Sequence, residues 1–175
     1  MTLLTKSLRT YLSSQQFFIA LIVILHAVGV VGLLSSFQEM FMALTPFHLL
    51  LTLLIVLRNF TQKSILIILL IATSSWLLEF IGVNTGLPFG EYNYGSTLGW
   101  KLGETPLLIA ANWVILLLSA GSLVKKFNLG ALVSSAGVAF AMTALDFIIE
   151  PVAIQLDFWS WNDPTIPWNN YLSWF

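Results

Sequence analysis

The sequence predicts an all-α protein, a polytopic transmembrane helical bundle with five spans. Apolar residues make up 58% of the 175 residues and charged residues only 9%, and the mean hydropathy is +0.89. A soluble domain of this length cannot bury so much apolar surface in its own core, whereas a bilayer can. The apolar residues also fall into five runs, each close to the roughly 20 residues that a helix needs to cross the hydrocarbon.

The predicted spans are residues 15–35, 41–57, 64–83, 105–124 and 129–152. The first follows Lys6 and Arg9, as the apolar region of a signal peptide would, but it is longer than a typical apolar region of that kind and lacks a clear A-x-A cleavage site. We therefore expect it to be retained. The chain has no internal repeat or low-complexity linker, so residues 1–175 are expected to form a single transmembrane domain.

Prolines predict where three of the helices begin, bend or end. In the second span, Pro46 either kinks the helix or follows Thr45 as the first helical residue. Thr105 and Pro106 give the same start signal for the fourth span. Pro151 should end or kink the fifth span.

The charged residues predict the orientation. Six of the seven basic residues fall on one side of this topology: Lys6, Arg9, Arg58, Lys63, Lys125 and Lys126. By the positive-inside rule the N-terminus is cytoplasmic, and residues 84–104 and the C-terminal segment face outward. We expect a multi-pass protein of a bacterial or archaeal inner membrane.

Composition also excludes several classes of function. The net charge is −1, which leaves no basic surface for nucleic acid. The chain has no cysteine and two histidines, which excludes Cys-ligated metals and argues against a di-iron oxygenase.

Three acidic residues lie within or at the ends of the predicted spans: Glu79, Asp146 and Glu150. An ionisable residue inside a membrane is expensive and is a functional hypothesis by default. At about 1.5 Å per residue, Glu79 and Asp146 each lie roughly 25 Å from the cytoplasmic start of their helices. Asp146 and Glu150 share a helix face, and His48 and Asn112 should fall in the same outer layer. Alternatively, Glu79 and Glu150 lie close enough to helix ends to reach the headgroups.

Residues 84–104, NTGLPFGEYNYGSTLGWKLGE, are the second unusual feature. They combine closely spaced glycines with Phe89, Tyr92, Tyr94 and Trp100. This composition predicts an ordered loop with tight turns that presents aromatic rings to something apolar. An interfacial aromatic belt has a similar composition, and for the tryptophans of the C-terminal segment the belt is the favoured interpretation.

An apolar cavity with carboxyl groups and aromatic walls suits acid catalysis on an alkene. Burial of a carboxyl favours its protonated form, which can then act as a general acid. Aromatic faces stabilise a nearby cation by about 0.5–2 kcal/mol each. These parts fit protonation of an isoprenoid double bond. The same acids could instead hold Mg²⁺ for a diphosphate, although basic residues are scarce on the outer side, or relay protons in a transporter.

Several segments resemble one family. They are EFIGVNTGLPFGEYNYG from Glu79, GETPLLIAANW, ALDFIIEPVA, the WSW at 159–161 and the ending IPWNNYLSWF, and together they cover residues 76–175. In these segments the chain resembles the carotenoid biosynthesis family of membrane hydratases, the CruF-type carotenoid 1,2-hydratases.

The resemblance implies addition of water to the terminal double bond of an acyclic carotenoid end group. It implies a lipid-soluble carotenoid substrate taken from the membrane, no cofactor, since hydration is redox-neutral, and no metal. Other carotenoid biosynthesis enzymes become candidate partners. The family usually continues into at least one further membrane helix beyond the position of Phe175. A carotenoid end-group cyclase and a non-catalytic carotenoid-binding or transport protein are the alternatives.

The chemistry and depth of individual residues suggest their roles. Asp146 is the first choice for the acid that protonates the alkene and Glu79 the second, while Glu150 tunes that acid or positions the water. His48 and Asn112 are candidate water-positioning groups. The expected lining of the end-group pocket is Trp76, Phe89, Tyr92, Tyr94 and Trp113.

Overall fold

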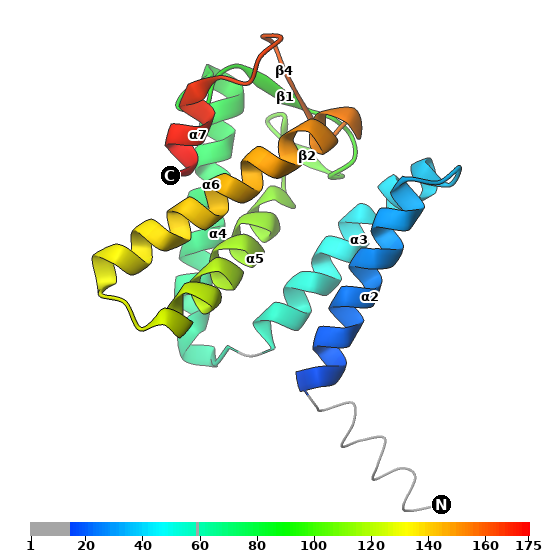
Figure 1. Cartoon of the computed structure of the whole chain (residues 1–175). Helices are drawn as coiled ribbons and strands as arrows, with labels where there is room; N and C mark the ends of the chain where they lie inside the picture. Colours follow the sequence, from blue (N-terminus) through cyan, green and yellow to red (C-terminus); the bar gives the residue numbers. More distant parts are fainter. Residues whose placement is uncertain (1–14, 59) are drawn as a thin grey trace, which may run out of the picture. The chain divides into compact units, whose positions relative to one another are not determined.

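The computed structural model describes residues 15–58 and 60–175, so Lys6 and Arg9 lie outside the described residues. In the part described, five helices are long and apolar enough to cross a membrane, which confirms the all-α prediction of five spans. They are α2 (Gln15–Leu33), α3 (Gln38–Leu57), α4 (Ile65–Thr85), α5 (Ile109–Val124) and α6 (Ala131–Gln155) (Figure 1). The chain divides into two compact units, Met1–His48 and Leu49–Phe175.

The first unit contains α2 and the first half of α3. The ring of Phe41 occupies the space where a side chain at position 32 would lie, so only Gly32 permits this packing. Further from the turn between the two helices, the Nε2 atoms of His26 and His48 lie 3.4 Å apart. The Nδ1 atom of His26 is 2.8 Å from the carbonyl oxygen of Ile22.

Helix α3 runs without interruption through Pro46. The alternative that the second span begins at Thr45 is therefore wrong. The missing N–H of Pro46 leaves one helical hydrogen bond unmade, but a membrane helix tolerates this because nearby side chains satisfy freed backbone groups. The hydroxyl of Thr45 donates to the carbonyl oxygen of Phe41 at 3.1 Å, which is next to the Met42 carbonyl that Pro46 deprives of its helical donor.

The second unit is built around α4, α5 and α6. Helix α5 packs against both α4 and α6, and the short helix α7 (Trp168–Trp174) packs against α6 (Figure 1). One-turn 3-10 helices, η1 (Gln62–Ser64) and η2 (Lys125–Phe127), precede α4 and follow α5.

The start predicted for the fourth span is wrong. Thr105 and Pro106 form strand β3, which pairs antiparallel with β2 (Lys101–Leu102), and α5 begins four residues later, at Ile109. Thr105 and Pro106, which the sequence assigned to the start of a helix, pair with β2 instead.

Pro151 does not end the last span, contrary to one of the two outcomes expected there. Helix α6 continues through it to Gln155. Beyond the proline the backbone resumes helical bonding, with Leu156 N–H donating to the Val152 carbonyl at 2.9 Å.

The loop between α4 and α5 is ordered by tight turns, as the sequence predicts. Gly86 caps α4 in the left-handed conformation at φ 72°, and Gly90 has φ 119°, both accessible to glycine. Strand β1 (Tyr92–Tyr94) then pairs antiparallel with β4 (Trp159–Trp161), the segment after α6, in the register Tyr92–Trp161. Two segments far apart in the chain are thereby joined over the end of the helices.

Candidate active site

The three acids predicted inside the membrane meet in one place. Glu79 comes from α4 and is 4% exposed, while Asp146 and Glu150 come from α6 and are each 1% exposed. All three line a cavity of about 30 Å³. A polar space of this size accommodates a water molecule. The alternative that Glu79 and Glu150 reach outward to headgroups does not fit this burial.

Glu79 is held by three hydrogen-bond donors. The hydroxyls of Tyr92 and Tyr94 donate to its Oε2 at 2.6 and 2.7 Å, and the indole N–H of Trp113 donates to its Oε1 at 2.8 Å. Gly82, one turn further along α4, makes this possible, because a Cβ there would lie 2.9 Å from the Tyr92 hydroxyl.

The two tyrosines keep their protons. Burial, reinforced by the neighbouring Glu79 carboxylate, raises the pKa of Tyr92 and of Tyr94 well above the ordinary tyrosine value. Both hydroxyls therefore remain neutral donors to Glu79 over the whole physiological range.

Glu150 is held in the same manner by aromatic N–H groups. The indole nitrogens of Trp159 and Trp161 donate to its Oε2 at 2.9 and 3.1 Å. Residues two apart on a strand lie on the same face, so the WSW spacing of β4 directs both rings to one carboxylate.

Asn170 on α7 connects the two acids of α6. Its Nδ2 donates to Asp146 Oδ2 at 2.7 Å and to Glu150 Oε1 at 3.3 Å. The other oxygen of Asp146, Oδ1, is buried and has no hydrogen-bond partner among the described residues. Asp146 thus differs from Glu79 and Glu150, whose oxygens are all engaged by donors.

The structure brings most of the predicted site residues together. Besides the three acids, the cavity is lined by four of them: Phe89, Tyr92, Tyr94 and Asn112. Trp113 reaches the same place through its bond to Glu79.

Two predicted residues neither line the cavity nor form a hydrogen bond with its acids. Trp76 is not among the cavity residues. It stacks on Phe80 with ring centroids 5.3 Å apart. His48 belongs to the first compact unit, where its partner is His26.

Several residues of the site were not predicted as site residues from the sequence. Asn170 was not singled out, and the tryptophans of the C-terminal segment were assigned to an aromatic belt. The structure instead directs Trp159 and Trp161 to Glu150 and stacks Trp174 on Trp113 with centroids 4.3 Å apart. The signal available was a pair of adjacent asparagines in a stretch rich in aromatic residues, IPWNNYLSWF.

Comparison with known proteins gives two matches. The family described as "Carotenoid biosynthesis protein" matches residues 33–175. Over 109 residues the chain is 34% identical to bisanhydrobacterioruberin hydratase of Haloarcula japonica, a match that covers 57% of this chain and 37% of that protein. The chain therefore spans well under two thirds of the length of this relative. No solved structure matches the chain.

Proposed function

Because the chain belongs to the carotenoid biosynthesis protein family, we propose that it is a hydro-lyase, a carotenoid 1,2-hydratase. It adds water across the terminal double bond of an acyclic carotenoid end group. The observation that carries this proposal is a water-sized cavity between three buried carboxyl groups in an apolar bundle. The hydratase activity in the name of the matched relative supports the same reaction class.

Asp146 is the proposed proton donor. The oxygens of Glu79 and Glu150 accept hydrogen bonds from neutral O–H and N–H groups, an arrangement that stabilises a carboxylate. Asp146 Oδ1 has no such partner in the part of the chain described. A protonated Oδ1 would satisfy that atom and face the cavity as an O–H donor.

The reaction balances with water as the only co-reactant. The π electrons of the terminal double bond take the proton from Asp146 onto C2 and leave a tertiary cation at C1. The water oxygen then bonds to C1, and one water proton returns to the Asp146 carboxylate. The product is a tertiary alcohol, and the acid is regenerated.

The remaining groups stabilise the cation and orient the water. Glu79, Tyr92 and Tyr94 line the same cavity. Aromatic faces and negative charge both favour a transient cation in a site that excludes bulk water. Asn112 also lines the cavity and is the proposed water-positioning amide.

Product analysis in a host that accumulates acyclic carotenes tests this proposal. We expect the unaltered protein to yield a pigment heavier by one water, Asp146→Asn to yield none, and Glu79→Gln to reduce the yield about 10²-fold. Asp163→Asn, a change at an exposed acid, is the matched control and should leave the yield unchanged. Each variant must reach the membrane in equal amount.

The same assay separates hydration from its alternatives. A product of unchanged mass that contains a new ring would indicate cyclisation instead of hydration. Cyclisation shares the protonation step. Unaltered carotene recovered with the protein would indicate binding without turnover. Hydration at the unaltered level by both Asp146→Asn and Glu79→Gln would exclude the acid assignment.

We also propose the setting in which the protein acts. Residues 1–175 form one transmembrane domain in a bacterial or archaeal inner membrane, with the N-terminus in the cytoplasm and the acid cavity toward the outer face. Support comes from Lys63, before α4, and from Lys125 and Lys126, after α5, since positive charge favours the cytoplasmic side. The lipid-soluble substrate enters from the bilayer, and other carotenoid biosynthesis enzymes are the proposed partners.

A further inference from the structure

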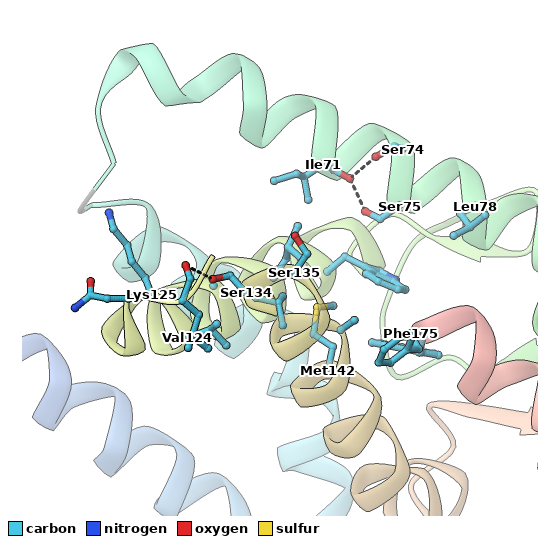
Figure 2. Close-up of a pocket in the computed structure, with 18 residues that line it drawn as sticks. Ile71, Ser74, Ser75, Leu78, Val124, Lys125, Ser134, Ser135, Met142 and Phe175 are labelled. Atoms are coloured by element: carbon cyan, nitrogen blue, oxygen red, sulfur yellow. Dashed lines mark hydrogen bonds between the residues drawn. The ribbon is translucent and has the colours of Figure 1, made fainter. Parts of the chain in front are cut away.

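A groove of about 930 Å³ lies among α4, α5, α6 and α7. Figure 2 shows Val124 and Lys125 at one end of it and Met142 and Phe175 toward the other. Its walls are mainly apolar. They include Ile71, Leu78, Leu117, Val138 and Met142.

The inner end of this groove adjoins the acid cavity. Trp174 lines both the groove and the cavity. Trp113 lines the groove and donates its indole N–H to Glu79. The two rings are stacked, with an interplanar angle of 15°, and they lie where the groove meets the cavity.

We propose that the groove binds the polyene chain of the carotenoid, with the reacting end group against the Trp113–Trp174 pair. This inference rests on the function proposed above and names where the rest of its substrate lies. From Trp113 to Lys125 the groove follows α5 for about 18 Å, at 1.5 Å per residue. A flat conjugated chain matches an apolar groove that ends in stacked indoles.

The size of the groove has a consequence for specificity. A carotenoid is longer than the stretch of α5 that lines the groove, so part of it lies outside the groove, in the surrounding lipid, and is not enclosed. One end group therefore reaches the acids in each binding event. The protein selects the reacting end and tolerates differences at the other end.

Gly121 offers a direct way to block the groove. It lies on the groove wall, and a Cβ added there meets no atom within 4 Å. Gly121→Leu should therefore fold and fill the groove with its own side chain. Gly29→Leu on α2 is the matched control, because a Cβ at Gly29 also meets nothing within 4 Å. Ser135→Leu obstructs the same groove from α6.

The experiment measures binding separately from turnover. Each change is made in the Asp146→Asn protein, which is purified in detergent from membranes rich in an acyclic carotene, and bound pigment per protein is read from absorbance. We expect Gly121→Leu and Ser135→Leu each to lower bound pigment about tenfold, because an overpacked site opposes the ligand. Gly29→Leu should bind as much pigment as its parent.

The outcomes distinguish this inference from the proposed function. Undiminished pigment in both groove variants would overturn the inference, as would release of a co-purified phospholipid by Gly121→Leu with the pigment retained. Pigment lost from the groove variants supports the inference even if the protein with Asp146 intact forms no hydrated product. In that case the reaction, not the groove, would be wrong.

Discussion

At the scale of single residues, the site contains carboxylates with unlike surroundings. Glu79 accepts bonds from two hydroxyls and one indole, whereas Asp146 accepts one amide bond at Oδ2. A buried charge is tolerated only when hydrogen bonds replace the water it has lost. The difference in donors therefore separates a group suited to remain charged from a group suited to carry a proton.

Asn170 should act as a positioning residue. Asn170→Leu removes both of its amide bonds, to Asp146 and to Glu150. Since a hydrogen bond to a charged group contributes about 1.5–3 kcal/mol, we expect product yield to fall by at least about tenfold. Pigment analysis at equal membrane level measures this, and Asn169→Leu, at the exposed neighbouring position, is the control. Equal losses from both variants would contradict a specific role.

The tyrosines predict how stability changes in alkali. Burial first, and Glu79 next, raise the pKa of Tyr92 and Tyr94 in the folded protein, while an unfolded tyrosine titrates near pH 10. Their contribution is complete below about pH 10 and falls as the pH rises above it, because the unfolded chain loses protons that the folded protein keeps.

Thermal unfolding in detergent across this pH range measures the effect. The double variant Tyr92→Phe, Tyr94→Phe should lose less stability per pH unit above about pH 10 than the parent, since its two rings do not titrate. Tyr171→Phe, which leaves both donors to Glu79 intact, is the comparison. Burial also raises the pKa of Tyr171, so its stability curve should differ from the parent's in the same direction but by less. If the stability of the parent and of the double variant fell equally with pH above about pH 10, the prediction would be contradicted.

The acids could be found from the sequence, and so could Tyr92, Tyr94 and Trp113 as residues beside them, but the donors from the C-terminal segment could not. Glu79, Asp146 and Glu150 interrupt apolar runs, where a charge is costly enough to be noticed. Asn170 and Trp159 carry no such signal, because polar and aromatic residues are ordinary at a membrane interface. Only the pairing of β1 with β4 and the packing of α7 bring them to the acids.

At the scale of elements, hydropathy predicted the helices correctly, whereas the proline signals predicted their ends wrongly. Hydropathy located all five spans, because a length near 20 apolar residues is a constraint of the bilayer. The start signal at Thr105–Pro106 and the stop signal at Pro151 were overridden, the first by pairing with β2 and the second by continuation of α6. Tertiary contacts decide such boundaries.

The close approach of the loop at Gly95 to the segment at Asp157 predicts how a single added methyl group changes stability. A Cβ at Gly95 would overlap the backbone oxygen of Asp157, so Gly95→Ala should force the loop away from the segment after α6. We expect a loss of about 1–3 kcal/mol in stability, measured by tryptophan fluorescence during thermal unfolding. Gly121→Ala, where nothing lies within 4 Å, should cause no loss, and equal effects of the two would refute this explanation.

At the scale of the whole molecule, the proposed orientation can be tested with single cysteines, because the natural chain has none. Trp100 is 85% exposed in the loop before α5. In intact cells we expect Trp100→Cys to react with a membrane-impermeant maleimide. Lys126→Cys, at the other end of α5, should react only after permeabilisation. The reverse pattern would invert the topology, and labelling of both in intact cells would exclude a span between them.

The pairing of β1 with β4 also imposes an order on biosynthesis. Tyr92–Tyr94 leaves the ribosome well before Trp159–Trp161, and at about 5–20 residues per second the interval lasts several seconds. During that time the loop lacks its strand partner, and Glu150 and Asp146 have yet to meet the tryptophans and Asn170. The acid site is therefore completed only after every described span has been synthesised. A nascent chain arrested before Trp159 should show a protease-sensitive loop that the finished protein protects.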